Sequence, residues 1–407
     1  MHYNTIIVGA GPAGLFAAQI LGKNKKKVLV LERNKRAGRK LLISGAGQCN
    51  FTHAGSIEDF LNCYHDQAKF IKKALYSFDN KQTMAFFESN GVPYQTFPNQ
   101  KVFPKSMKSE DILNVLINAC QKGNVEMAYN ELVTQISVYD GVFTVETGSG
   151  KRYFGDHVII ATGGKSYPQL GSDGSGYHLA ESLGHKIIPP RPALTDVRLA
   201  NNPYREISGV SVQDVMVTIW RDGKKVKDNQ GDFLFTHRGI SGPAIINSSR
   251  WMEEQDVLTV NFLYPRSYDE IKALFAETLA QRGKEEVLTF LKPFQLPKAL
   301  VQMLCKQIKV DEHTACAQIS KKVREELVVM LTKCPFKIES LGGFHLAMVT
   351  AGGVHLKEVN PTTMESRKQK GLYFVGEVLD VDGITGGYNI QAAFSMGHLC
   401  ATHIAKY

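Results

Sequence analysis

Residues 5–14 are Thr5-Ile6-Ile7-Val8-Gly9-Ala10-Gly11-Pro12-Ala13-Gly14, and a helix-like, apolar stretch follows them directly. An apolar strand, a glycine-rich turn and a helix in this order are typical of a dinucleotide-binding fold. Gly9 permits the tight turn out of the strand, and Gly11 lets the backbone approach a pyrophosphate. Gly14 allows the helix to pack closely on the strand. The stretch therefore predicts a dinucleotide site.

A second strand and an acid strengthen this prediction. The apolar run from Lys27 to Leu31 ends in Glu32, whose carboxylate can accept hydrogen bonds from both ribose hydroxyls. The same carboxylate would repel the extra phosphate of NADP. Amide groups at the start of the first helix, and the positive end of its dipole, favour an anion there. A glycine turn alone is a weak signal, but the order strand, turn, helix, strand and acid is specific.

Composition limits the class of protein. The chain has 407 residues, of which 43% are hydrophobic, so it is long and apolar enough for more than one domain. No run approaches the roughly 18 apolar residues that cross a bilayer, and no charged segment followed by an apolar one precedes the first strand, so no targeting segment is expected. We therefore expect no membrane association and a cytoplasmic location. The seven cysteines are scattered and never spaced as Cys-x-x-Cys, so neither a metal site nor a redox pair is predicted.

The formal charge of +9 raises the question of nucleic acid. Lysines concentrate in residues 23–27 and 224–227, which we interpret as surface turns. No aromatic residues alternate with these lysines, so the pattern favours a solvated face over an RNA groove. We therefore do not expect a nucleic-acid partner.

Periodicity divides the chain further. Residues 51–94 are polar and helix-like, and a helix is predicted over 110–120 with Ser109 as its cap. Strands over 132–139 and 142–146 flank an Asp-Gly turn, and an apolar strand over 157–161 leads into Ala161-Thr162-Gly163-Gly164. These small residues would let the chain pass close beside a cofactor.

The pattern changes near residue 190. Pro189-Pro190-Arg191-Pro192 is expected to be a stiff connector, and the alternation over 215–263 predicts a small barrel. Helical spacing follows over 267–334, and sheet-like residues return at 372–375. The dinucleotide domain is therefore predicted to be discontinuous.

Residues 371–391 contain a second strand-to-helix junction, with Glu377 and Asp382 after the strand and glycines before Asn389. FAD needs such a junction for its ribityl chain and ring, whereas a nicotinamide enzyme does not. A helix that starts near Asn389 would stabilise negative charge on a reduced flavin. The sequence therefore favours FAD over free NAD.

Four further motifs are those of a known family: residues 38–50 (GRKLLISGAGQCN), 161–164 (ATGG), 235–243 (FTHRGISGP) and 363–367 (TMESR). Over nearly its full length the chain resembles bacterial FAD-dependent oxidoreductases known as HI0933-like or aminoacetone oxidase-like flavoproteins. Members usually carry glycine and arginine before the Cys-Asn pair, where this chain has Ala46 and Gln48. A charge-based role at position 48 is therefore in doubt.

The resemblance implies an α/β fold with a Rossmann-type FAD domain that is interrupted by a β-barrel domain, inside which a small helical domain is nested. The implied boundaries are 1–193 and 345–407 for the FAD domain, 194–265 and 335–344 for the barrel, and 266–334 for the helices.

The resemblance also implies the cofactor contacts. The residues implied are Gly9, Gly11, Pro12, Ala13, Gly14, Glu32, Arg33, Arg39, Lys40, Ser44, Gly45, Gly47, Cys49, Asn50, Val133, Ala161, Thr162, Gly163, Gly376, Glu377, Asp382, Gly387, Asn389 and Ile390. Residues 9–32 would hold the adenosine half, and Arg39 and Lys40 would lie near phosphate or ribityl oxygens. Residues 44–50 would pass near the flavin ring, and Val133 would contact adenine through its backbone.

No catalytic acid or base can be named, because flavin N5 itself can accept hydride. His237, His345 and Tyr388 are candidates, but structural hydrogen bonding explains each of them better. A redox role for Cys49 is not favoured, because no resolving cysteine neighbours it. The glycines of residues 171–176 do not follow the dinucleotide pattern, so NAD(P)H, if used, would bind transiently against the flavin.

The leading interpretation is an FAD-dependent oxidoreductase that acts on a small organic substrate by hydride transfer through flavin N5. The resemblance offers an amino ketone or a conjugated ketone such as a bile-acid intermediate. A flavin-containing protein that binds or modifies RNA is the alternative, and a dehydrogenase that uses NAD alone is a third. The sequence leaves open the oligomeric state, the direction of the reaction and the electron acceptor.

Overall fold

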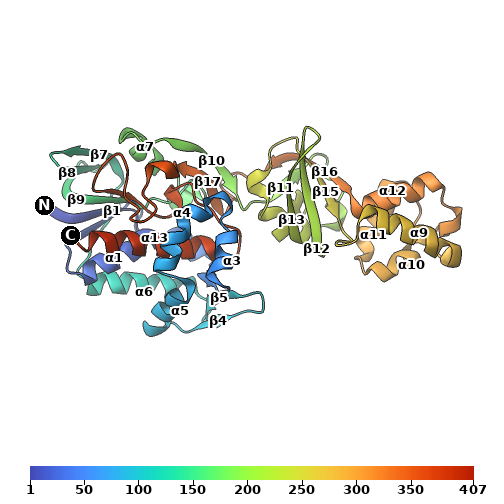
Figure 1. Cartoon of the computed structure of the whole chain (residues 1–407), viewed down its shortest axis with the longest axis horizontal. Coiled ribbons are helices and arrows are strands. Elements are labelled where there is room, and N and C mark those ends of the chain that lie inside the picture. Colours follow the sequence, from blue (N-terminus) through green and yellow to red (C-terminus); the bar gives the residue numbers. More distant parts are fainter. The chain divides into compact units, whose positions relative to one another are not determined.

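The computed structural model describes residues 1–407, except for the side chain of residue 280, and the chain forms two compact units (Figure 1). Unit 1 comprises Met1–Arg191 and Met348–Tyr407, and unit 2 comprises Pro192–Ala347. Each unit has its own hydrophobic core. The first unit is therefore built from both ends of the chain, as predicted for a discontinuous domain.

A seven-stranded sheet forms the centre of unit 1. Its order is β6 (Glu126–Tyr129), β2 (Val28–Glu32), β1 (His2–Val8), β9 (Arg152–Ile160), β8 (Val142–Thr147) and β7 (Val133–Tyr139). The strands β6, β2, β1 and β9 are parallel, whereas β8 and β7 form an antiparallel hairpin. The short strand β18 (Leu372–Phe374) pairs in parallel with the last three residues of β9. All residues of β2 are buried, as expected for a strand with helices on both faces.

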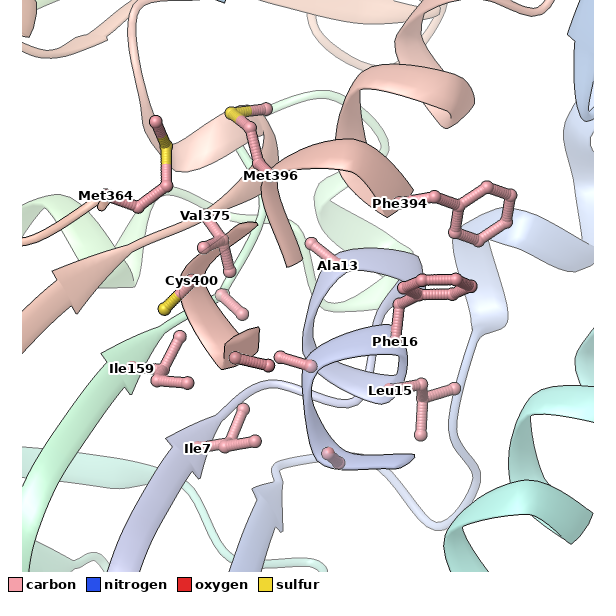
Figure 2. Close-up of a cluster of buried hydrophobic side chains, with 14 of the residues drawn as sticks. Ile7, Ala13, Leu15, Phe16, Ile159, Met364, Val375, Phe394, Met396 and Cys400 are labelled. Atoms are coloured by element: carbon pink, nitrogen blue, oxygen red, sulfur yellow. The ribbon is translucent and has the colours of Figure 1, made fainter. Parts of the chain in front are cut away.

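Two helices of unit 1 pack directly on each other (Figure 2). They are α1 (Pro12–Lys23) and α13 (Tyr388–Ile404), and Phe16 of α1 lies 5.2 Å from Phe394 of α13 between ring centroids. A third helix, α6 (Ser109–Lys122), also packs against α1. The predicted cap of α6 was wrong: Lys108 is the N-cap, and the Ser109 hydroxyl donates instead to the Leu42 carbonyl at 2.7 Å.

The segment after β2 makes a partly helical excursion. It contains α2 (Arg39–Ile43), α3 (Ile57–Asn62), α4 (Ala68–Ser77) and α5 (Asn80–Ser89). It also forms an antiparallel sheet in the order β3 (Thr52–His53), β5 (Lys101–Pro104) and β4 (Tyr94–Thr96), which the prediction of a helix-like segment over 51–94 missed in part. Strands of two and three residues are too short to show a period of two.

Another difference concerns the proline-rich connector. Its residues belong to β10 (Ile187–Ala193), the strand that follows α7 (Ser175–Ser182). Strand β10 forms a two-stranded sheet with β17 (Val349–Val354). Proline lacks an N–H group but is tolerated in an edge strand, where half of the backbone groups need no partner. The stiff segment is therefore a strand.

Unit 2 contains a closed barrel, in the order β11 (Val197–Leu199), β14 (Gly239–Ser241), β13 (Lys224–Phe235), β12 (Ser211–Arg221), β15 (Val257–Asn261) and β16 (Cys334–Leu341). Phe233, Phe235, Phe262 and Phe336 pack together in its core. The short helix α8 (Pro243–Ile246) follows β14.

Four helices lie in sequence between β15 and β16: α9 (Tyr268–Arg282), α10 (Val287–Leu291), α11 (Lys298–Gln307) and α12 (Lys321–Thr332). Ser267 and Glu270 form a capping box at the start of α9. The predicted fold class, a Rossmann-type domain interrupted by a barrel with a helical insert, is confirmed. The residue boundaries that divide unit 2 stay a prediction. Within the described residues, no helix is long and apolar enough to cross a membrane.

Candidate functional site

Two strand-to-helix junctions meet at one edge of the central sheet. In the sheet register Ile160 lies beside Val8 on one side and beside Phe374 on the other, so β1, β9 and β18 end at the same level. A Cβ built on Gly376, just after β18, would lie 2.9 Å from the Cβ of Ala13 in the first turn of α1. The junctions at residues 9–14 and 376–390 are therefore brought together, although most of the chain separates them.

The glycine turn leaves room for a ligand at one position only. A Cβ on Gly9 would lie 2.5 Å from the Ala161 carbonyl oxygen, and one on Gly14 would lie 2.1 Å from the Gly9 carbonyl oxygen. A Cβ on Gly11 would meet nothing within 4 Å. Gly11 is also the N-cap of α1 and offers no side-chain cap. The backbone at Gly11 is therefore open to a phosphate, as the dinucleotide pattern requires.

Glu32 lies where the ribose of such a ligand is expected. Its side chain is 7% exposed; one oxygen accepts the backbone N–H of Ala10 at 2.9 Å, and the other accepts the backbone and side-chain N–H groups of Asn34 at 2.8 and 2.7 Å. These bonds tie the acid to the glycine turn and keep it oriented. The Glu32 backbone carbonyl accepts the N–H of Glu131. Val133, the predicted adenine contact, follows two residues later and therefore lies near the same end of β2.

The three predicted basic contacts are already engaged by the protein. Arg33 forms an ion pair with Asp173 at 2.5 Å, Arg39 donates to the Asn34 side chain at 2.9 Å, and Lys40 bonds both oxygens of Glu377 at 2.7 and 3.0 Å. Burial acts to raise the pKa of Asp173, but the hydrogen bonds from Arg33 and Ser175 hold it below its ordinary value. These cations therefore fix loops around the site as well as contributing positive charge.

The glycine-rich segment 171–176 packs against the first dinucleotide unit. A Cβ on Gly176 would lie within 1.8 Å of the Thr162 hydroxyl, and one on Gly163 would lie 2.9 Å from the Ser172 hydroxyl. The Ser172 hydroxyl is buried without a protein hydrogen-bond partner. The segment thus packs against Thr162 and Gly163, and it leaves a polar atom that a ligand can satisfy.

The loop after α2 contains several residues whose backbone adopts the left-handed conformation. Positive φ angles occur at Gly45 (+55°), Ala46 (+55°), Gly47 (+87°) and Cys49 (+60°). Burial raises the pKa of the Cys49 thiol to about 12, so the thiol stays protonated at neutral pH. The Asn50 side chain donates to the carbonyls of Thr52 and Val102 at 2.8 and 2.9 Å. Asn50 thereby joins the loop that begins at Ser44 to the small sheet.

The start of α13 lies against the same sheet. Gly387 is its N-cap at a φ of +94°, and a Cβ there would lie 2.5 Å from the Thr52 carbonyl oxygen. The Asn389 side chain accepts from the Gly383 N–H and donates to the Gly383 carbonyl, both at 2.8 Å. Asp382 in this loop is buried and Ile390 half-buried. The predicted flavin-end residues are therefore neighbours, and Asn389 holds the loop itself.

The candidate acids and bases fall in different places. Tyr388 is buried, stacks on His53 at 4.9 Å and meets Phe60 edge-on, and burial raises its pKa well above the ordinary value. His237 and His345 are exposed and belong to unit 2.

Two residues near the site escaped sequence reasoning. His53 lies on a two-residue strand, and Thr350 accepts the backbone N–H groups of Lys165 and Ser166 at 2.8 and 3.1 Å. The Thr350 N–H donates to Glu377 at 2.8 Å. Only the tertiary fold brings these residues to the site, so no local signal identifies them.

The observed features fit FAD. Both α1 and α13 begin without a side-chain cap, a buried acid lies at the ribose position, and the backbone is open at Gly11. Bound FAD would supply a ring that exchanges hydride with a substrate. The residues at the two helix starts would orient it and stabilise its negative charges.

Comparison with known proteins gives a family and full-length relatives. The family model described as "HI0933-like protein Rossmann domain" matches residues 3–403. The chain is 34% identical to the ribosomal RNA dihydrouridine synthase of Haemophilus influenzae, over 100% of this chain and 99% of that protein. The Escherichia coli protein of the same name is 32% identical, over 98% and 97%. The 3-dehydro-bile acid delta(4,6)-reductase of Clostridium scindens is 30% identical, over 98% of each.

Solved structures share the fold. The 3-ketosteroid delta1-dehydrogenase of Sterolibacterium denitrificans has a TM-score of 0.52 at 12% identity, over 100% of this chain and 99% of that one. At this identity the likeness concerns the fold alone.

Proposed function

Because the chain belongs to the HI0933-like family of FAD-dependent oxidoreductases, we propose that it reduces a carbon–carbon double bond that is conjugated to a carbonyl group. In uridine the C5=C6 bond of the base is conjugated to the C4 carbonyl, and reduction of that bond gives dihydrouridine. The bile-acid relative is named for a reduction at positions 4 and 6 of a 3-keto steroid. Both names therefore describe reduction of the same type of bond. The proposal rests on the full-length similarity of this chain to the proteins with these names.

Uridine in ribosomal RNA is the proposed substrate. Two relatives named for this reaction align with 98–100% of the chain at 32% and 34% identity. The excess of 48 basic over 39 acidic residues suits a polyanionic partner. The expectation that nucleic acid is not a partner therefore lacks support.

A small conjugated ketone is the second candidate. The Clostridium scindens relative, at 30% identity over 98% of the chain, favours it. A conjugated ketone is one of the two small-molecule substrates, with an amino ketone, that the family resemblance implies.

In this proposal each part of the site has a defined task. Gly11 and the start of α1 bind the pyrophosphate, Glu32 binds the ribose, and the start of α13 faces the flavin ring. Reduction of a conjugated bond adds a hydride to one carbon and a proton to the other, so two electrons must come from a donor. We propose NAD(P)H as a transient donor and the cytoplasm as the location.

An anaerobic experiment tests the reaction. The FAD-loaded protein is reduced with NADPH or dithionite and mixed with unmodified ribosomal RNA transcribed in vitro, or with a cyclic conjugated ketone. Substrate-dependent return of oxidised-flavin absorbance, together with dihydrouridine or a saturated ketone detected by mass spectrometry, is the expected result. The proposal fails if neither compound reoxidises the flavin faster than buffer does. Glu32→Ala protein, depleted of FAD, serves as the control for reactions that need no flavin.

A further inference from the structure

The central strand of the small sheet, β5, has one buried side and one partly exposed side. Along β5 the side chains of Val102 and Pro104 are buried, whereas those of Lys101 and Phe103 are partly exposed. This alternation follows from the strand geometry, in which successive side chains point to opposite faces. Lys105, which follows the strand, is exposed.

Pairing extends the partly exposed side across all three strands. In the register His53 of β3 lies beside Lys101, and Gln95 of β4 lies beside Phe103. The N–H of Phe97, just after β4, donates to the Lys101 carbonyl at 2.9 Å. We call the surface made by His53, Gln95, Phe97, Lys101, Phe103 and Lys105 the open face.

The chemistry of the open face is aromatic and basic. Phe97 is 38% exposed and meets Phe103 edge-on, with ring centroids 5.3 Å apart and an angle of 78°. Lys101 and Lys105 flank these rings, and none of the six side chains of the open face carries a carboxylate. Accessible aromatic rings beside cations are what proteins use to bind single-stranded nucleic acid, because bases stack on the rings and phosphates meet the cations.

The open face borders the candidate flavin site on two sides. The ring of Phe103 lies 3.4 Å from the position of a Cβ on Gly45, in the loop after α2. His53 stacks on Tyr388 at the start of α13, and its ring lies 3.6 Å from the position of a Cβ on Gly386. A strand of RNA on the open face would therefore run directly toward the loops proposed to surround the flavin ring.

We propose that the open face binds a single-stranded segment of RNA beside the target uridine, with a base stacked on Phe97 and Phe103 and phosphates at Lys101 and Lys105. This inference rests on the proposed function and adds the surface that recognises its substrate. A small ketone has no phosphates and no neighbouring bases, so it gives the lysines nothing to bind.

Binding of a fluorescent single-stranded RNA dodecamer to the FAD-loaded protein tests the proposal. Phe97→Ala should weaken binding about tenfold, and Phe97→Tyr should bind as the wild type does, because loss of one base–aromatic stack costs about 1–3 kcal/mol. Lys101→Ala should reduce the slope of log affinity against log salt by about 0.7, as expected for one lost phosphate contact to a single strand. Matched controls are Tyr139→Ala, at an exposed aromatic on the β7–β8 turn, and Lys224→Ala, at an exposed lysine of the barrel.

The outcomes separate the two proposals. If Phe97→Ala binds the RNA as tightly as the wild type does, or if Tyr139→Ala weakens binding equally, the open face is not the RNA surface. The proposed reaction is not contradicted by either result. A Phe97→Ala variant that loses activity on a small ketone and keeps its RNA affinity also overturns it. If the wild type binds no RNA at low salt and reduces only the ketone, the RNA substrate itself is wrong. Unchanged flavin absorbance in each variant excludes a damaged cofactor site.

Discussion

Ala46 adopts a backbone conformation that glycine prefers. Its φ is +55°, and it lies between Gly45 and Gly47, which also have positive φ angles. A Cβ in the left-handed region costs about 1–2 kcal/mol, because it approaches the following carbonyl oxygen. The loop beside the proposed flavin ring is therefore strained at Ala46.

Replacing Ala46 with glycine should relieve this strain. We expect Ala46→Gly to raise the free energy of unfolding by up to about 1 kcal/mol, because the strain removed exceeds the added chain entropy. Urea unfolding followed by circular dichroism measures the change. Ala273→Gly, on the exposed side of α9, should instead lower stability by about 1 kcal/mol. A loss of stability in Ala46→Gly would contradict the strain argument.

Glu32 provides a prediction on cofactor affinity. Glu32→Ala removes a charged acceptor for the ribose hydroxyls and frees the Ala10 N–H, so FAD affinity should fall by about 1.5–3 kcal/mol. Equilibrium dialysis against FAD measures the change. Asp256→Asn alters another buried acid, held by Arg221 in the barrel, and should leave FAD affinity unchanged. Equal affinities of Glu32→Ala and wild type would remove Glu32 from the site.

At the scale of elements, the contact between α1 and α13 determines how the two strand-to-helix junctions of the candidate site lie together. A Cβ built on Gly397 would lie 2.5 Å from the Ala13 carbonyl oxygen, so the two backbones touch at this point. Ala13 is also the residue that meets Gly376. The position of α13 therefore controls how the second junction lies against the first.

Gly397→Ala should push these helices apart. We expect a loss of about 1–3 kcal/mol in stability, as is usual when a packed core is overfilled, and weaker FAD binding. Thermal unfolding and a flavin titration measure the two effects. Gly343→Ala is the matched control, because a Cβ there meets nothing within 4 Å. A tolerated Gly397→Ala would show that α13 can shift without loss of the site.

The elements themselves were largely predictable from sequence, whereas their association was not. The first strand, turn and helix, the hairpin around Asp140 and the C-terminal helix occur where their patterns place them. The pairing of β18 with β9 joins residues more than two hundred positions apart, and no local period encodes it. The open face escaped prediction because its strands are short and because only strand pairing brings Phe97, just after β4, beside Lys101 and Phe103 of β5.

At the scale of the whole molecule, the two units carry different titrating groups. Burial lowers the pKa of His53, His157, His185 and His398, and all four belong to unit 1. In unit 2 the hydrogen bond to Glu286 raises the pKa of the exposed His313. Near and below the ordinary pKa of histidine, about 6.5, these four histidines bind more protons in the unfolded form than in the folded form. We therefore expect their contribution to the stability of unit 1 to fall as the pH falls.

This difference predicts two transitions that respond differently to acid. The chain has two tryptophans, Trp220 and Trp251, both in unit 2, whereas the flavin would report on unit 1. Between about pH 7.5 and about pH 5.5, the flavin-fluorescence transition should move to lower temperature more than the tryptophan transition does. His398→Phe, which keeps the stacking on Phe78, should reduce the flavin shift. Equal shifts of both probes would contradict the assignment.

The insertion of unit 2 into unit 1 has a consequence for synthesis on the ribosome. Residues 192–347 are synthesised before Gly376, Gly387 and Asn389, so unit 2 leaves the exit tunnel ahead of the second junction. The barrel can therefore fold on the nascent chain, as domains commonly do during translation. Because the proposed second junction leads into the final helix, we expect flavin capture to follow the folding of unit 2.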